Sequence, residues 1–182
     1  MSNPRQDLER TTCACAGCQM CCRHMPGALI QGDLELIAEH TGNGVHEGNQ
    51  VALSLDWLLE HFEASEGARI IVGAHGPDPQ AVSIPSLVPR LTEKGCIFLT
   101  EDGHCSIHEV APFGCAYHDT HMTKEEGDPR SQAAVESQYS AWKNGDSYGT
   151  YWTVLHKHGK IASPLRERRD NLSKAWEELD GG

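Results

Sequence analysis

The cysteines constrain the fold of this 182-residue chain more than any other feature of its sequence. Five of the eight lie in residues 13–22, where the pattern from Cys15 to Cys22 reads C-x-x-C-x-x-C-C, and three follow much later, at positions 96, 105 and 115. Adjacent cysteines, and four thiols within eight residues, are poorly suited to a framework of disulfides. We therefore interpret the cysteines as reduced metal ligands, and keep a disulfide framework as the weaker alternative.

The composition indicates that the chain needs such help to fold. Leu, Ile, Val and Phe make up about 19% of the residues and the formal net charge is −11, a combination close to that of disordered chains. Residues 1–122 hold six basic and sixteen acidic side chains, whereas residues 123–182 hold nine and ten. A metal bound within residues 13–122 would supply order that a small apolar core cannot.

The same numbers argue against several classes of protein. No stretch approaches the roughly 18 apolar residues that cross a membrane, and residues 1–10 lack the apolar region of a secretory signal. No basic patch accompanies the cysteines, which argues against nucleic acid as a partner. We therefore expect a cytoplasmic protein that binds neither membranes nor nucleic acid, and whose partner is a protein or a small molecule.

Two local geometries fit the first cysteine group. In a helix, at about 100° per residue, the four cysteines of the C-x-x-C-x-x-C-C core fall within about 120° of arc, with Cys13 on the opposite side. In a tight loop, the C-x2-C-x2-C spacing followed by Pro26 matches the opening of the bacterial ferredoxin pattern, although Met25 stands where the fourth cysteine would. Both geometries predict that this group binds metal.

The second group lies around a predicted β-hairpin. Asp102-Gly103, between residues 96–100 and 104–107, is a strong signal for a two-residue turn. In a regular hairpin of this register Cys96 and Cys105 share one face but lie roughly 13 Å apart, too far to bind one zinc ion. The hairpin is therefore irregular, the metal centre is polynuclear, or there are two sites.

Helical patterns dominate the rest of the chain. Asp33 and Ser54 are the expected N-caps of two helices between the cysteine groups, and short strands are expected at residues 69–72 and 81–84. Apolar and aromatic residues recur at helical spacing after residue 123, and Ser163-Pro164 predicts the start of the last helix.

We predict a mainly α-helical fold with a small β-hairpin, an irregular cysteine-rich segment organised by metal, and C-terminal helices whose aromatic side chains enter the core. The expected parts are a flexible tail at residues 1–12, a metal-binding domain at residues 13–122, and a helical extension at residues 123–182 that packs on this domain.

Histidines are further candidate ligands. Of the eleven, His104 and His108 flank the second predicted strand, and His118 and His121 follow Cys115 at i, i+3 spacing. A single histidine is more commonly solvated or hydrogen-bonded, but nitrogen ligands can leave a coordination position open for chemistry. His118 and His121 are therefore the first pair to test.

The first cysteine group, together with residues 95–115 (GCIFLTEDGHCSIHEVAPFGC), resembles the CxxCxxCC or YkgJ-type family, whose members are described as zinc- or iron-chelating. The resemblance covers roughly residues 13–121. It implies that seven cysteines at matching positions are metal ligands, namely Cys15, Cys18, Cys21, Cys22, Cys96, Cys105 and Cys115. The family commonly carries arginines where this chain has Ala111 and Ala116, so a role of those arginines toward an anion or substrate does not carry over.

The flagellin lysine N-methylases share the cysteine cluster, and this resemblance implies an iron–sulfur centre. We therefore expect the chain to hold iron, as an iron–sulfur cluster or an ion, or zinc, with a redox or modification role. One alternative is a zinc-stabilised structural or interaction module. The other is a protein-modifying enzyme similar to the flagellin lysine N-methylases, although the sequence has no glycine-rich nucleotide loop to support it.

Overall fold

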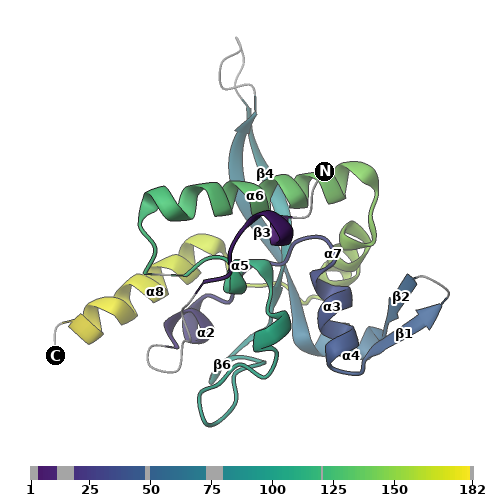
Figure 1. The fold of residues 1–182 in the computed structure, drawn as a ribbon, viewed down its shortest axis with the longest axis horizontal. Helices are drawn as coiled ribbons and strands as arrows, with labels where there is room; N and C mark the ends of the chain where they lie inside the picture. The colour runs from purple at the N-terminus through teal and green to yellow at the C-terminus, as the bar shows by residue number, and fades with distance from the viewer. Residues whose placement is uncertain (1–3, 12–18, 48–49, 73–79, 120, 181–182) are drawn as a thin grey trace.

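The computed structural model of the chain describes residues 4–11, 19–47, 50–72, 80–119 and 121–180 (Figure 1). These residues are mainly helical, as predicted. The α-helices are α1 (Pro4–Asp7), α2 (Met20–His24), α3 (Asp33–His40), α4 (Leu55–His61), α5 (Phe113–Ala116), α6 (Lys124–Asn144), α7 (Ser147–Lys157) and α8 (Leu165–Asp180), with a 3-10 turn, η1, at His108–Val110.

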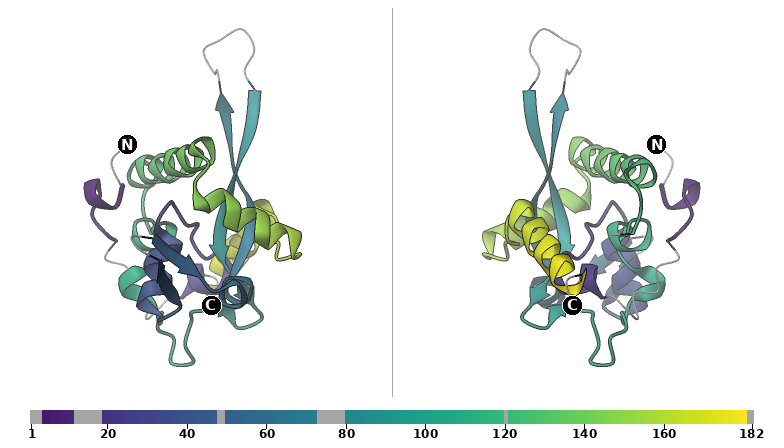
Figure 2. Two further views of the ribbon diagram at one scale, coloured as in Figure 1. Left: turned by 90° about the vertical axis from the view of Figure 1, so that its right-hand side faces the viewer. Right: turned by 90° about the vertical axis from the view of Figure 1, so that its left-hand side faces the viewer.

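Strands form more of the molecule than the single small hairpin that we predicted. The described residues contain three separate antiparallel pairs: β1 (Gly44–Glu47) with β2 (Gln50–Leu53), β3 (Phe62–Val72) with β4 (Gln80–Pro89), and β5 (Leu91–Thr92) with β6 (Gly95–Cys96). The strands expected at residues 69–72 and 81–84 are therefore only the outer part of the β3–β4 hairpin. The hairpin rises from the body, and its far end stands clear of the helices (Figures 1 and 2).

The inner half of the β3–β4 hairpin is part of the hydrophobic core. Phe62 pairs with Pro89 and Ala64 with Leu87, and these four residues are buried. Helices cover both faces of this part of the hairpin. Its strands therefore lack the alternation of apolar and polar residues that marks a strand with one exposed face. The prediction missed the segment for that reason.

One large hydrophobic cluster joins elements from both sides of residue 122. It includes Leu34 of α3, Phe62 of β3, Leu87 of β4, Ala141 of α6 and Leu155 of α7. Tyr148 on α7 is buried in this cluster, donates its hydroxyl hydrogen to the carbonyl of Leu29 at 2.9 Å and accepts from the N–H of Leu87 at 2.9 Å. The first turn of α7 is thereby tied to β4 and to the chain that follows α2.

The helix termini agree only in part with the expected caps. Ser54 caps α4 by accepting from the N–H of Trp57, as predicted. Asp33 is not an N-cap but the first residue of α3, and its carboxylate accepts instead from the N–H groups of Ile30, at 3.0 Å, and Phe113, at 2.7 Å. Tyr139, which we expected in the core, is 47% exposed.

Residues 4–11, within the segment expected to be a flexible tail, contact the body over the stretch that precedes and includes α5. Arg5 forms an ion pair with Asp33 at 2.8 Å and donates to the carbonyl of Ala111. The N–H of Thr11 donates to the carbonyl of Ala116 at 2.8 Å. None of the described helices combines the length and apolar character needed to cross a membrane.

Candidate metal centre

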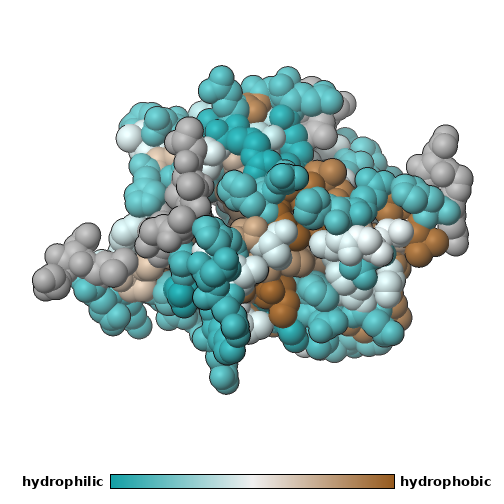
Figure 3. Space-filling model, turned by 60° about the horizontal axis from the view of Figure 1, so that its bottom comes forward, coloured by the Kyte–Doolittle hydropathy of each residue, from teal (hydrophilic) through white to brown (hydrophobic). Residues whose placement is uncertain are grey.

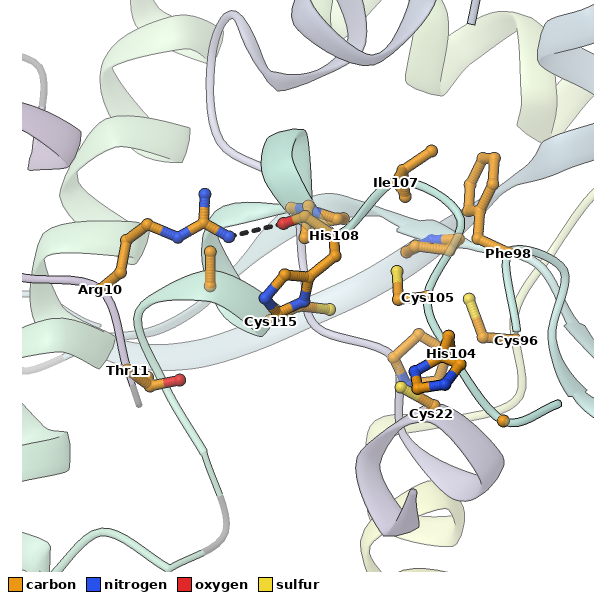
Figure 4. Close-up of a pocket in the computed structure, with 16 residues that line it drawn as sticks. Arg10, Thr11, Cys22, Cys96, Phe98, His104, Cys105, Ile107, His108 and Cys115 are labelled. Carbon is orange, nitrogen blue, oxygen red and sulfur yellow. Dashed lines mark hydrogen bonds between the residues drawn. The ribbon is translucent and has the colours of Figure 1, made fainter. Parts of the chain in front are cut away.

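Four of the predicted ligands surround one cavity of about 340 Å³. Cys22 comes from α2, Cys96 from β6, Cys105 from the loop that follows, and Cys115 from α5, and their side chains point into the same space (Figure 4). These residues are up to 93 positions apart in the sequence. The tertiary structure therefore brings both cysteine groups together.

The loop between Cys96 and Cys105 is not the regular hairpin that we predicted. The N–H of Gly103 donates to the carbonyl of Thr100, Gly103 has φ +83°, and the N–H of Thr100 donates to the carbonyl of His104. These bonds define a three-residue loop, a type I turn followed by a left-handed glycine, in place of the two-residue turn. The register therefore shifts by one residue, and Leu99 rather than Thr100 lies opposite Cys105.

A second irregularity lies on the Cys96 side of this loop. The N–H of Leu99 donates to the carbonyl of Cys96 at 2.8 Å, so the chain turns immediately after β6 instead of continuing as a strand. Cys96 and Cys105 consequently line one cavity and are not held at opposite ends of a ladder. Of the three explanations offered for the hairpin, irregularity is confirmed.

The first cysteine group does not form one continuous helix. The helix that carries Cys21 and Cys22 begins at Met20, and the preceding Gln19 has a left-handed backbone with φ 50°. Such a residue cannot continue a right-handed helix, so a single helix through the whole group is excluded, whereas the tight-loop alternative stays a prediction. Cys22 lines the cavity, whereas Cys21 is half-buried and is not among its lining residues. Three further predicted or candidate ligands, Cys13, Cys15 and Cys18, lie outside the described residues.

Two glycines allow Cys115 to reach the cavity. Gly27, which follows α2, and Gly114 of α5 lie back to back, and a Cβ on Gly27 would come within 2.1 Å of the carbonyl carbon of Gly114. The N–H of Gly114 donates to the carbonyl of Ala28 at 2.9 Å, and the N–H of Gly27 points at the Cys115 sulfur at 3.1 Å. Only glycine fits at Gly27 without moving the backbone that positions Cys115.

Burial favours the neutral form of three cavity thiols, Cys96, Cys105 and Cys115. It raises the pKa of Cys96 to about 12 and that of Cys115 well above its usual range, and neighbouring thiols add to both effects. A cation bound among these sulfurs would supply the positive charge that thiolates require. The donor set therefore fits a thiophilic metal.

The spacing of the donors is wide. Among the described residues, no group of three Cys, His, Asp or Glu side chains is close enough to hold a single metal ion. Sulfurs that share one zinc ion lie about 3.8 Å apart, because each is about 2.3 Å from the metal. The four thiols surround space for a centre larger than one ion, or for further ligands from elsewhere in the chain.

Of the four candidate histidines, the pair that we chose to test first, His118 and His121, is not at the cavity. The side chain of His118 lies against Gly127 of α6, and the ring of His121 packs edge-on against Trp176 of α8 at 5.4 Å. Instead His104 and His108 line the cavity near the thiols, together with Arg10 (Figure 4). Arg10 donates to the carbonyls of His108 and Glu109, a contact across about one hundred residues that no local pattern could reveal.

The surface on this side of the molecule is mostly hydrophilic, with patches of apolar side chains between the polar ones (Figure 3). The cavity itself has apolar walls, which include Pro26, Pro89 and Pro112. Ala111 and Ala116, the positions where the resembling family commonly has arginine, also line it. With these small side chains, the polar lining consists of the four thiols together with Arg10, Thr11, His104 and His108.

Comparison with protein families identifies what kind of protein carries such a site. The family model CxxCxxCC, described as "Putative zinc- or iron-chelating domain", matches residues 14–140. The chain therefore belongs to the CxxCxxCC family, as the cysteine spacing indicated, and metal chelation is the property by which this family is described. The match extends past residue 121 into α6. Neither the curated proteins nor the solved structures yield a significant match.

Proposed function

We propose that this protein holds a polynuclear iron centre of the iron–sulfur type in the cysteine cavity. Cys22, Cys96, Cys105 and Cys115 would supply thiolates from the described part of the chain. Cys15, Cys18 and Cys21 would complete the ligand set, since Thr11, just before the first group, and Cys22, its last member, both line the cavity.

The observation that carries the proposal is the wide arrangement of four thiols around a single space. A closed structural zinc site needs four donors that converge on one ion, and no three described donors do so. Iron–sulfur clusters contain several metal atoms bridged by sulfide and are bound by cysteine thiolates from separate segments. Thiols from four elements around about 340 Å³ suit the second chemistry better than the first.

Access to the cavity supports a redox or modification role over a purely structural one. His104 is exposed, with 64% of its side chain accessible, and it lines the cavity together with Arg10 and His108. A buried structural site would be closed by packed side chains, whereas this cavity has polar groups where a partner could approach. We propose a protein or a small molecule as that partner.

The test is to purify the protein anaerobically and measure iron, zinc and acid-labile sulfide per chain together with the absorption spectrum. We expect iron and sulfide in comparable amounts and broad absorption near 400 nm. A colourless protein with full zinc occupancy would instead support the zinc-stabilised structural module.

Single substitutions assign the centre to the cavity. Cys105→Ser and Cys115→Ser should each lower the iron content by more than half, because each removes a ligand that the cavity cannot replace. Ser106→Ala is the matched control, since Ser106 is adjacent to Cys105 in the same loop but does not line the cavity. Wild-type iron content in both cysteine variants would contradict the proposed location.

A further inference from the structure

A second, smaller cavity lies directly behind the cysteine cavity. Pro26 and Pro89 line both, so these two prolines form the wall between them. The second cavity has a volume of about 160 Å³, and α8 begins beside it, just after Ser163. A water molecule takes up about 30 Å³ in the liquid, so this cavity has room for about five waters or a ligand of similar size.

A buried arginine faces this space. Arg168 on α8 lines the cavity and is only 4% exposed. Its Nε donates to the carbonyl of Ser163 at 3.0 Å and its Nη2 to the hydroxyl of Ser65 at 2.8 Å. A guanidinium carries five N–H groups, and in the described part of the chain only these two bonds are made. The guanidinium plane is thus fixed while three N–H groups remain available.

A carboxylate, Glu63, lies in the same cavity but forms no direct ion pair with Arg168. Glu63 on β3 also lines the cavity, and among the described residues no ion pair joins it to Arg168 within 4.0 Å. Burial lowers the pKa of Arg168 and raises that of Glu63, so neither charge is fully compensated by the other. Arg90 and Lys160 are also close enough to act on Glu63.

This arrangement selects a particular ligand chemistry. The planar fork of an arginine matches the two oxygens of a carboxylate. The Glu63 carboxylate accepts from the N–H of Leu91 and can accept a further hydrogen bond from a ligand. The rest of the wall combines apolar Val88 and Ala162 with polar Thr92 and Ser163. The local charge favours an added carboxylate, because the cations Arg90, Lys160, Arg168 and Arg169 outnumber the acids Glu63 and Glu66 in this neighbourhood.

We propose that the cavity between β3 and the start of α8 binds a small amino- or hydroxy-carboxylate, whose carboxylate pairs with Arg168 and whose amine or hydroxyl donates to Glu63. A ligand of about six non-hydrogen atoms, such as alanine or lactate, is of the right size for the cavity. This site is separate from the metal centre, and the proposal does not depend on which metal the cysteines hold.

The experiment is isothermal titration calorimetry on the full-length, metal-loaded protein with four probes: L-alanine, L-lactate, propionate and inorganic phosphate. We expect alanine or lactate to bind at least about tenfold more tightly than propionate, because propionate has no amine or hydroxyl to donate to the half-buried carboxylate of Glu63. If none of the probes binds measurably, the cavity holds only water and the proposal is overturned. Equal affinity for propionate, or a preference for phosphate, would also overturn the proposal.

Three variants locate the binding. Arg168→Lys keeps the charge but not the fork and should weaken alanine or lactate by about tenfold or more. Glu63→Gln should reduce the preference over propionate to near unity. Arg166→Gln is the matched control, because Arg166 lies on the same helix with its side chain 92% exposed, and it should bind as the wild type does. The wild-type probe series decides the proposal even if a variant fails to fold.

Discussion

Phe62, Leu87 and Leu155 fill the large hydrophobic cluster with side chains that are completely buried. By contrast, the four thiols of the cysteine cavity surround about 340 Å³ of space, and burial favours the neutral form of Cys96, Cys105 and Cys115. The cluster is stabilised by close packing of large side chains. The cavity shares the buried Phe98 and Ile107 with this cluster, and we expect the order of the chain around the thiols to depend on what the thiols bind. We therefore expect the two neighbouring regions to be ordered differently, the cluster by close packing and the cavity by what its thiols bind.

Removal of the metal should have the largest effect, because it should disorder the cavity region and leave the packed cluster intact. Residues 95–117, which carry three of the cavity thiols, should lose hydrogen-exchange protection on chelation, while α6 and α7 keep theirs, because metal binding in small sites contributes on the order of 10 kcal/mol to folding. The measurement is amide hydrogen exchange by mass spectrometry before and after chelation. A uniform change across both regions would contradict the separation.

Leu155→Ala tests the packed region. Leu155 is fully buried in the large cluster, so removing three carbons should lower the free energy of unfolding by about 2–5 kcal/mol. Metal content per folded chain should stay at the wild-type value, since Leu155 does not line the cysteine cavity. Denaturant titration and elemental analysis of the same preparation measure both. A large loss of metal would show that the two regions are not independent.

Asp33 connects the two regions and gives the connection a pH dependence. Its carboxylate accepts from the N–H of Phe113 at the start of α5 and pairs with Arg5, and burial raises its pKa from 3.8 to about 6 despite these contacts. An acid whose pKa is higher in the folded state binds more protons when folded, so its contribution to stability is greatest below about pH 4 and is lost as the pH rises through about 6.

Asp33→Asn should therefore be more destabilising at pH 4.5 than at pH 7.5. The difference between the two pH values should be about 3 kcal/mol or less, as expected for a shift of roughly two pKa units. Denaturant titrations of wild type and variant across this range measure it. Glu39→Gln, a change to an exposed carboxylate on the same helix, is the control. A cost independent of pH would contradict the role assigned to Asp33.

Thr123→Ala should have the smallest effect. Thr123 caps α6 in a reciprocal arrangement with Glu126, and its loss should cost about 1 kcal/mol. The change lies outside both the large cluster and the cysteine cavity, so metal content should not vary. A thermal melt and metal analysis provide the measurements, and a drop in metal content would mean that the start of α6 supports the cavity.

Much of the helical structure could be predicted from local patterns. Ser54 was identified as a cap because its hydroxyl can accept from an N–H within one turn, and the structure has that bond to Trp57. The outer part of β3–β4 was predicted as two short strands, but the inner part was missed because both faces are buried. The Asp102-Gly103 turn was placed correctly but given the wrong length, since one left-handed glycine suits either loop type.

Sequence spacing alone was enough to assign the chain to a metal-chelating family, because thiols so close together leave few other uses for cysteine. Only the tertiary structure could show that Cys22, Cys96, Cys105 and Cys115 share a cavity, that His104 and His108 join them, and that His118 and His121 do not. The reason is physical: spacing constrains neighbours within a few residues, whereas contacts across ninety residues depend on backbone packing such as that of Gly27 against Gly114.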